Sequence, residues 1–119
     1  MNVIEIVNGR ASVTEWNALD YETIKRFVDG PIEGVVLNAG SARSDVIAYI
    51  NAEGEIRHDL AENCHLPNGR IVYGNALVVG IGPNGTDRGL TFDEIERVVL
   101  VDTPGSPLPT LTVVSNWVE

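Results

Sequence analysis

The sequence predicts an α+β domain with a mainly antiparallel sheet of about five to six strands and two short helices. Runs of β-branched and apolar residues of strand length recur along the 119-residue chain. The turn-forming pair Asn8-Gly9 lies between the first two of these runs. Two short segments, residues 20–30 and 91–97, carry helix-capping residues and helical spacing. Together these observations favour hairpins interrupted by helices over a parallel α/β arrangement.

The length and composition indicate one globular domain. At 119 residues the chain can bury a core without disulfides or a structural metal. Hydrophobic residues make up 44% and charged residues 21%, both close to globular averages. We expect residues 1–102 to form a single α+β domain. Residues 103–119 are expected to form a Pro-rich connector followed by a C-terminal strand or docking tail.

The charge balance disfavours several classes of partner. The formal net charge is −9, so the chain repels phosphate backbones, and we expect no nucleic-acid partner. No stretch has the length of a transmembrane helix, and the N-terminus lacks a basic region followed by an apolar block. The sequence therefore predicts a cytoplasmic protein with no membrane partner.

The N-terminal residues predict a β-hairpin. Residues 3–7 are a β-branched run, and residues 11–16 alternate between two faces. Asn8-Gly9 between them favours a type I′ turn, in which both central residues have positive φ.

A short helix is expected next. Asp20 is an N-cap residue, and residues 21–28 place apolar side chains on one face. Gly30 is expected to form the C-cap, and Pro31 cannot continue the helix. This helix is expected to cover one face of the sheet.

The middle of the chain predicts further strands. Residues 32–37 and 45–50 read as strands, separated by a small-residue loop at residues 38–43. Residues 51–54 are expected to turn the chain into a short return strand at residues 55–57, which gives a second hairpin.

Two more local elements are expected before the central strand. Residues 60–66 are ambiguous, and we expect a short helical turn there. Pro67-Asn68-Gly69 is a turn, after which residues 70–73 approach the central strand.

The centre of the fold is expected at Ala76–Ile81, an apolar strand followed by a glycine-rich loop at residues 82–89. Thr91 and Glu94 then form a capping box, which marks the start of the second helix. Residues 97–102 fit either a continued helix or a strand. Residues 103–109 are expected to be an extended, polyproline-like connector. Residues 111–114 could pair as a last edge strand or dock on a neighbouring subunit.

The glycine-rich loop contains a literal G-x-G-x-x-G pattern at residues 80–85, with Asp102 where a ribose-binding acid is expected. In a dinucleotide fold the helix begins inside that motif, so that its amides meet the pyrophosphate. Here the helix cap is Thr91, well after the motif, and Pro83 lacks an amide hydrogen. An ordinary strand-to-helix loop is therefore the favoured interpretation.

The same loop remains a candidate for binding a small anionic ligand. The candidate residues are Gly82, Asn84, Gly85, Arg88 and Arg43. Arg57 and Arg70 also lie in loops or near strand ends. Ion pairs with nearby carboxylates are the simpler explanation for all of these arginines.

Residues 58–65 contain ligand types that zinc prefers, namely His58, Asp59, Cys64 and His65. Adjacent residues of an extended chain point to opposite faces, so Cys64 and His65 do not readily share a site. A Cys–His nucleophile lacks a third orienting group here. We therefore expect no metal, no cofactor and no catalytic residue, and we interpret Cys64 as a small buried apolar residue.

The two tryptophans, Trp16 and Trp117, lie near the two ends of the sequence. Each fits either a place in the core or an anchor in a subunit interface.

Several segments resemble those of a known family. These are the short helix before residues 30–33, the turn at residues 49–54, the strand at residues 74–80 and the run Leu90-Thr91-Phe92-Asp93-Glu94-Ile95-Glu96. This run is similar to the L-T-x-E-E-I pattern of the domain of unknown function 3846 family. Over residues 1–100 the chain resembles that family, and Leu60 and Asn63 agree with its L-P-P-N-R patch. The resemblance implies no activity and suggests a phage or mobile-element origin.

Two functions from different classes follow as hypotheses. The first is a non-catalytic binding module whose partner is a host protein or a second copy of the chain. The alternative is a small-molecule or nucleotide-binding protein that uses residues 80–89 with Arg88 and Arg43. An enzyme that uses His58, Asp59, Cys64 or His65 is the weakest hypothesis.

Overall fold

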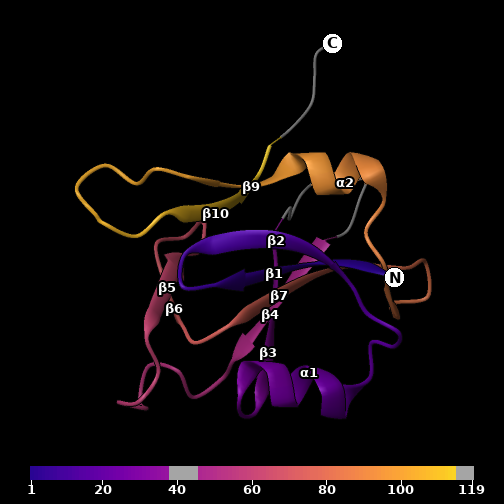
Figure 1. Ribbon diagram of the computed structural model, residues 1–119, viewed down its shortest axis with the longest axis horizontal. Coiled ribbons are helices and arrows are strands. Elements are labelled where there is room, and N and C mark those ends of the chain that lie inside the picture. Colours follow the sequence, from indigo (N-terminus) through magenta and orange to yellow (C-terminus); the bar gives the residue numbers. More distant parts are fainter. Residues whose placement is uncertain (38–45, 115–119) are drawn as a thin grey trace.

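The computed structural model describes residues 1–37 and 46–114, and everything below concerns those residues (Figure 1). The elements in chain order are β1 (Asn2–Val7), β2 (Arg10–Glu15), α1 (Tyr21–Val28), β3 (Ile32–Val36), β4 (Val46–Asn51), β5 (Glu62–His65), β6 (Ile71–Tyr73), β7 (Ala76–Ile81), β8 (Asp87–Arg88), α2 (Phe92–Arg97), β9 (Val98–Val101) and β10 (Thr110–Val113). The main sheet has the order β2-β1-β7-β4-β3, with β8 paired to β7, and a second sheet has the order β6-β5-β10-β9. The predicted α+β class with two short helices and a main sheet of five to six strands is confirmed.

Strand β7 is the centre of the main sheet, and the sheet is covered on both faces. On one face, Leu77 and Val79 pack with Val3 and Ile24, and Ile24 lies on α1. On the other face, Val78 belongs to a core that also includes residues of β5, β6 and β10. Figure 1 shows α1 on one side of the main sheet and the β9–β10 hairpin on the other. Burial on both faces explains why residues 76–81 are a continuous apolar run.

The N-terminal hairpin is confirmed. Strands β1 and β2 pair antiparallel over their full lengths, from Asn2 opposite Glu15 to Val7 opposite Arg10. Asn8 and Gly9 have φ of 51° and 76°, as a type I′ turn requires.

A side chain of the second sheet also binds the turn at residues 8–9. The buried Asn63 side chain accepts a hydrogen bond from the Gly9 amide at 2.6 Å. It donates to the carbonyls of Ile6 at 2.8 Å and Gly74 at 2.9 Å. One of the two positions that match the family's L-P-P-N-R patch is therefore a structural bridge between the two sheets.

Helix α1 has the predicted bounds, but its C-terminal end differs from the prediction. Asp20 caps the first turn through the Thr23 amide at 2.8 Å. The left-handed C-cap is Asp29, with φ of 65°, and not Gly30. Gly30 is instead a site of close approach, because a Cβ there would collide with the side chain of Asn51. Asn51 is buried and donates to the carbonyls of Val28 and Asp29, which closes the helix.

Two predictions for residues 51–66 are wrong. The return strand expected at residues 55–57 is absent from the described chain, which forms consecutive turns there. Both edges of β4 are already paired, with β3 and β7, and the amides of Ile56 and Arg57 donate instead to the Glu53 carbonyl at 3.1 Å. The helical turn expected at residues 60–66 is strand β5, which pairs antiparallel with β6 and parallel with β10.

In the last third of the chain, the structure decides between helix and strand for residues 98–101 and differs from two of the sequence predictions. Helix α2 ends at Arg97, and residues 98–101 form strand β9. The connector at residues 103–109 is not extended, because the Ser106 amide donates to the Thr103 carbonyl at 3.1 Å. Strand β10 lies between β5 and β9, so it is an interior strand and not an edge strand. Leu111 of β10 is fully buried in the core.

The loop predicted at residues 38–43 lies outside the described residues. None of the described helices is long and apolar enough to cross a membrane.

Candidate functional site

The candidate anion loop is a tight hairpin between β7 and β8. The Gly82 amide donates to the Thr86 carbonyl at 2.7 Å, and the Gly85 amide donates to the Gly82 carbonyl at 3.0 Å. Asn84 and Gly85 are exposed at its tip. Two of the motif amides that would cradle a phosphate are therefore used inside the turn.

Tyr49 holds the hairpin to the main sheet. Its hydroxyl donates to the Asp87 carboxylate at 2.6 Å. Burial raises the pKa of Tyr49, and the hydrogen bond to Asp87 raises it further. The hydroxyl therefore stays protonated and acts as a donor that fixes β8.

Arg88, the central residue of the anion hypothesis, is engaged by a carboxylate of its own chain. Its guanidinium donates to both Glu94 oxygens at 2.8 Å, and to the Gly89 carbonyl at 2.9 Å. Gly80 of the glycine motif makes room for this pair, because a Cβ there would collide with the guanidinium. The first glycine of the motif thus accommodates an arginine side chain.

Glu94 is the buried member of this ion pair, with 2% of its side chain exposed. It also completes the predicted capping box, in which it accepts from the Thr91 amide at 2.9 Å. Burial alone would raise the pKa of Glu94, but the hydrogen bonds from Arg88 and Thr91 outweigh burial and hold the pKa below its usual value. The carboxylate is therefore ionised and fully bonded.

The zinc-type residues do not converge. Cys64 lies in the core, where burial raises the pKa of its thiol to about 11. His65 points away from it, with Nδ1 at 3.1 Å from the Gly69 carbonyl and Nε2 at 2.9 Å from Ser106 Oγ. Asp59 pairs with Arg57, and His58 is exposed. Within residues 1–37 and 46–114, no group of three or more His, Cys, Asp or Glu side chains could hold a metal ion.

The other described loop arginines also form ion pairs. Arg70 donates to both oxygens of Glu33, at 2.8 and 3.0 Å, and this hydrogen bonding holds the pKa of Glu33 below its usual value. Arg57 bridges Asp29 and Asp59. Arg43 lies outside the described residues.

Trp16 is half-buried beneath α1. Its ring meets Phe27 edge-on, with centroids 5.5 Å apart, and its indole NH donates to Glu5 at 2.8 Å. Trp117 lies outside the described residues. The indole of Trp16 therefore packs within its own chain.

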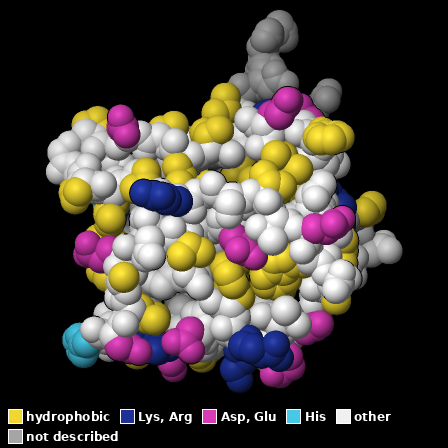
Figure 2. Space-filling model, in the orientation of Figure 1, with side chains coloured by type: hydrophobic (Ala, Val, Ile, Leu, Met, Phe, Trp, Pro, Cys, Tyr) yellow, Lys and Arg dark blue, Asp and Glu magenta, His cyan; other side chains and the backbone are white. Residues whose placement is uncertain are grey.

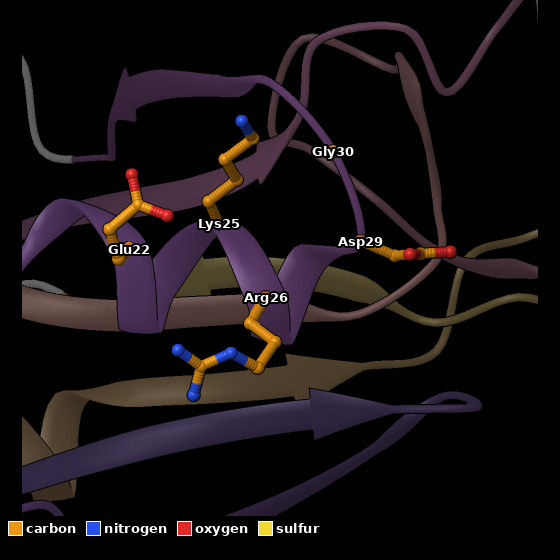
Figure 3. Close-up of a pocket in the computed structure, with 5 residues that line it drawn as sticks. All are labelled: Glu22, Lys25, Arg26, Asp29 and Gly30. Atoms are coloured by element: carbon orange, nitrogen blue, oxygen red, sulfur yellow. The ribbon is translucent and has the colours of Figure 1, made fainter.

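Two open hollows adjoin the C-terminal end of α1. The first, of about 350 Å³, is lined by Glu22, Lys25, Arg26, Asp29 and Gly30. Figure 3 shows Lys25 and Arg26 pointing away from each other. The second, of about 220 Å³, has Asp29 in common with the first. The cations do not converge on a point, and a helix C-terminus carries partial negative charge. Neither hollow forms an anion site.

A candidate binding feature that sequence reasoning missed is the outer edge of β2. Met1 and Trp16 exchange two backbone hydrogen bonds of 2.9 Å, so by the antiparallel alternation every second residue of β2 bonds to β1. The backbone NH and C=O groups of Ala11, Val13 and Glu15 then point away from β1. Among the described residues, no hydrogen bond reaches these groups.

The side chains of β2 are also exposed to solvent. Arg10, Ala11, Ser12, Val13 and Glu15 are all exposed, with 54% of Val13 accessible. Figure 2 shows hydrophobic and charged side chains interspersed on the face that carries β2. A sequence signal existed, since residues 10–15 contain only two apolar side chains, Ala11 and Val13, and both are small or medium in size.

Comparison with known proteins identifies a family. No curated protein and no solved structure matches the chain. A family model described as a domain of unknown function, DUF3846, matches residues 1–100. The resemblance drawn from the sequence is therefore confirmed, and the chain belongs to the DUF3846 family.

Proposed function

We propose that the protein is a non-catalytic interaction module that binds another protein chain along the outer edge of β2. The observation that carries this proposal is the row of outward backbone groups at Ala11, Val13 and Glu15, which no described residue pairs. An open strand edge is a template for an added strand. Backbone hydrogen bonds would supply affinity, and the exposed Val13 side chain would supply an apolar contact.

The alternative functions receive less support. A catalytic site needs a reactive group, yet the Cys64 thiol is buried and protonated. The ionised Glu94 carboxylate is already engaged in an ion pair with Arg88. An anion site on the hairpin at residues 82–89 would compete with Glu94 for the same guanidinium. A partner from the host of a mobile element stays a prediction that follows from the family resemblance.

The test uses a substitution that alters only the open edge. Val13→Pro removes an amide hydrogen that points away from β1, so the β1–β2 hydrogen bonds remain, and proline is tolerated at such edge positions. Val13→Thr is the matched control, because it keeps the amide and a β-branched side chain. Both variants should retain the wild-type circular dichroism.

The measurement is capture by tagged protein in a lysate of cells that also make an untagged copy, with captured chains identified by mass spectrometry. We expect wild type and Val13→Thr to retain a protein that Val13→Pro loses. Equal capture by all three, or no capture by wild type, would contradict the proposal.

A further inference from the structure

Resting on the proposed function, we propose that the chain added to β2 is the β2 strand of a second copy. The two strands would run antiparallel about a twofold axis at Val13. A main sheet that ends at β2 in each copy would then continue across the axis. Such isologous twofold pairs are the commonest closed assembly of identical chains.

The hydrogen-bonding pattern of β2 matches itself in this arrangement. The outward groups belong to Ala11, Val13 and Glu15, which are spaced evenly about Val13. Val13 faces Val13 of the second copy, and Ala11 faces Glu15 of the second copy. Each outward NH therefore meets an outward C=O. Ser12 falls opposite Thr14 of the second copy, a pairing of hydroxyl side chains that stabilises strand pairs.

The charges of β2 select the antiparallel direction. A net charge of −9 makes most approaches between two copies repulsive. The two charged residues of β2 are Arg10 at one end and Glu15 at the other, and both are exposed. Antiparallel pairing brings Arg10 to the end of the second strand that carries Glu15, where the two side chains lie on opposite faces of the sheet and balance the charge of that end. Parallel pairing would instead place like charges side by side.

Strand β2 lacks two of the residue types that normally prevent such pairing, although β9 lies close to it on one face. Strand β2 contains no proline and no lysine, and its register with β1 is regular over all six pairs. By contrast, the edge strand β6 of the second sheet is only three residues long. A six-residue strand spans roughly 20 Å. Pairing through it alone forms a small interface, so we expect a dissociation constant in the micromolar range.

Sedimentation equilibrium of the purified protein over a wide concentration range tests the pairing. We expect a monomer–dimer equilibrium for wild type and a similar one for Val13→Thr. Val13→Pro removes both hydrogen bonds at the axis, so its dissociation constant should rise by roughly 30-fold. A wild-type protein that stays monomeric overturns the self-pairing. Capture of a different protein that depends on Val13 would still support the proposed function.

A charge exchange tests the direction of pairing in folded protein. Arg10→Glu should weaken the dimer, because both ends of β2 then become acidic. The double variant with Arg10→Glu and Glu15→Arg should restore the wild-type constant, because each end of the paired strands again carries one charge of each sign. A dimer that neither Val13→Pro nor Arg10→Glu weakens would show that the copies meet at another surface.

Discussion

The ion pair between Arg88 and Glu94 predicts a large and specific loss of stability on substitution of Glu94 by glutamine. The substitution keeps the size of the side chain but removes its charge and one acceptor. The new amide NH₂ would then face a guanidinium, which is also a donor. The bond from Arg88 to Oε2 and the charge of the pair would be lost, whereas the remaining amide oxygen can still accept at the Oε1 position from Thr91 and from one guanidinium nitrogen.

The expected loss in the free energy of unfolding follows from the different solvent exposure of Arg88 and Glu94. Hydrogen bonds to charged groups stabilise by roughly 1.5–3 kcal/mol each. Arg88 is 33% exposed, so water recovers part of that energy on its side, whereas Glu94 is buried. We therefore expect Glu94→Gln to lower the free energy of unfolding by about 3 kcal/mol. For a domain of this length, that is a fall in Tm of about 10 °C.

Thermal and urea unfolding of Glu94→Gln at pH 7 measure this loss. Glu96→Gln is the matched control, since Glu96 is exposed on the same helix, and its Tm should change little. Because the folded-state pKa of Glu94 is lowered, its charge stabilises the fold above the unfolded-state pKa of about 4.3. That contribution is lost as the pH falls through the folded-state pKa, so the gap between wild type and Glu94→Gln should narrow in acid. If Glu94→Gln unfolds like Glu96→Gln at pH 7, the pair does not hold the hairpin to α2.

Three further outcomes are expected. Asn63→Ala removes three hydrogen bonds, two of which join the second sheet to the β1–β2 hairpin, so urea unfolding should show a loss of about 2–4 kcal/mol; a loss below about 0.5 kcal/mol would contradict the bridge. Gly80→Ala should lower Tm in wild type but far less in Glu94→Gln, where the charge of the Arg88 pair is already lost; additive losses would contradict the steric role of Gly80. Cys64 should stay unreactive towards a thiol reagent at pH 8 until urea is added, and rapid native labelling would contradict its burial.

The elements that the sequence predicted well are those whose causes lie within a few residues. Asn8-Gly9 fixes its turn through backbone conformations that few other residues adopt. Asp20 and Thr91 begin their helices through bonds to amides three residues later. Local signals of this kind need no knowledge of the tertiary fold.

The elements that the sequence missed depend on distant partners. Strand β5 is a strand because it pairs with β6 and because His65 meets Thr110 of β10, forty-five positions later. Residues 55–57 do not pair with β4 because β3 and β7, which are distant in sequence from these residues, occupy both of its edges. Neither feature can be predicted from neighbouring residues alone, because tertiary contacts override the local conformational propensity.

The candidate site shows the same limit. Arg88 and Glu94 were each visible in the sequence, Arg88 as a candidate for anion binding or for an ion pair and Glu94 as a helix-capping residue. Their pairing depends on the hairpin that folds β8 back on β7 beside Gly80. A glycine pattern therefore supports phosphate binding only when its amides remain unpaired and its helix begins within it.

The proposed use of β2 agrees with how this chain places its polar groups. The described loop arginines form ion pairs with carboxylates. The buried side-chain amides of Asn51 and Asn63 donate hydrogen bonds to backbone carbonyls. These particular side chains are therefore not available to recognise a partner by charge or by hydrogen bonds. A strand edge needs no such side chains, because it offers a donor and an acceptor at every second residue. Recognition through the backbone also allows an acidic surface to bind without a basic partner, provided that the meeting strand carries balanced charge, as β2 does with Arg10 and Glu15.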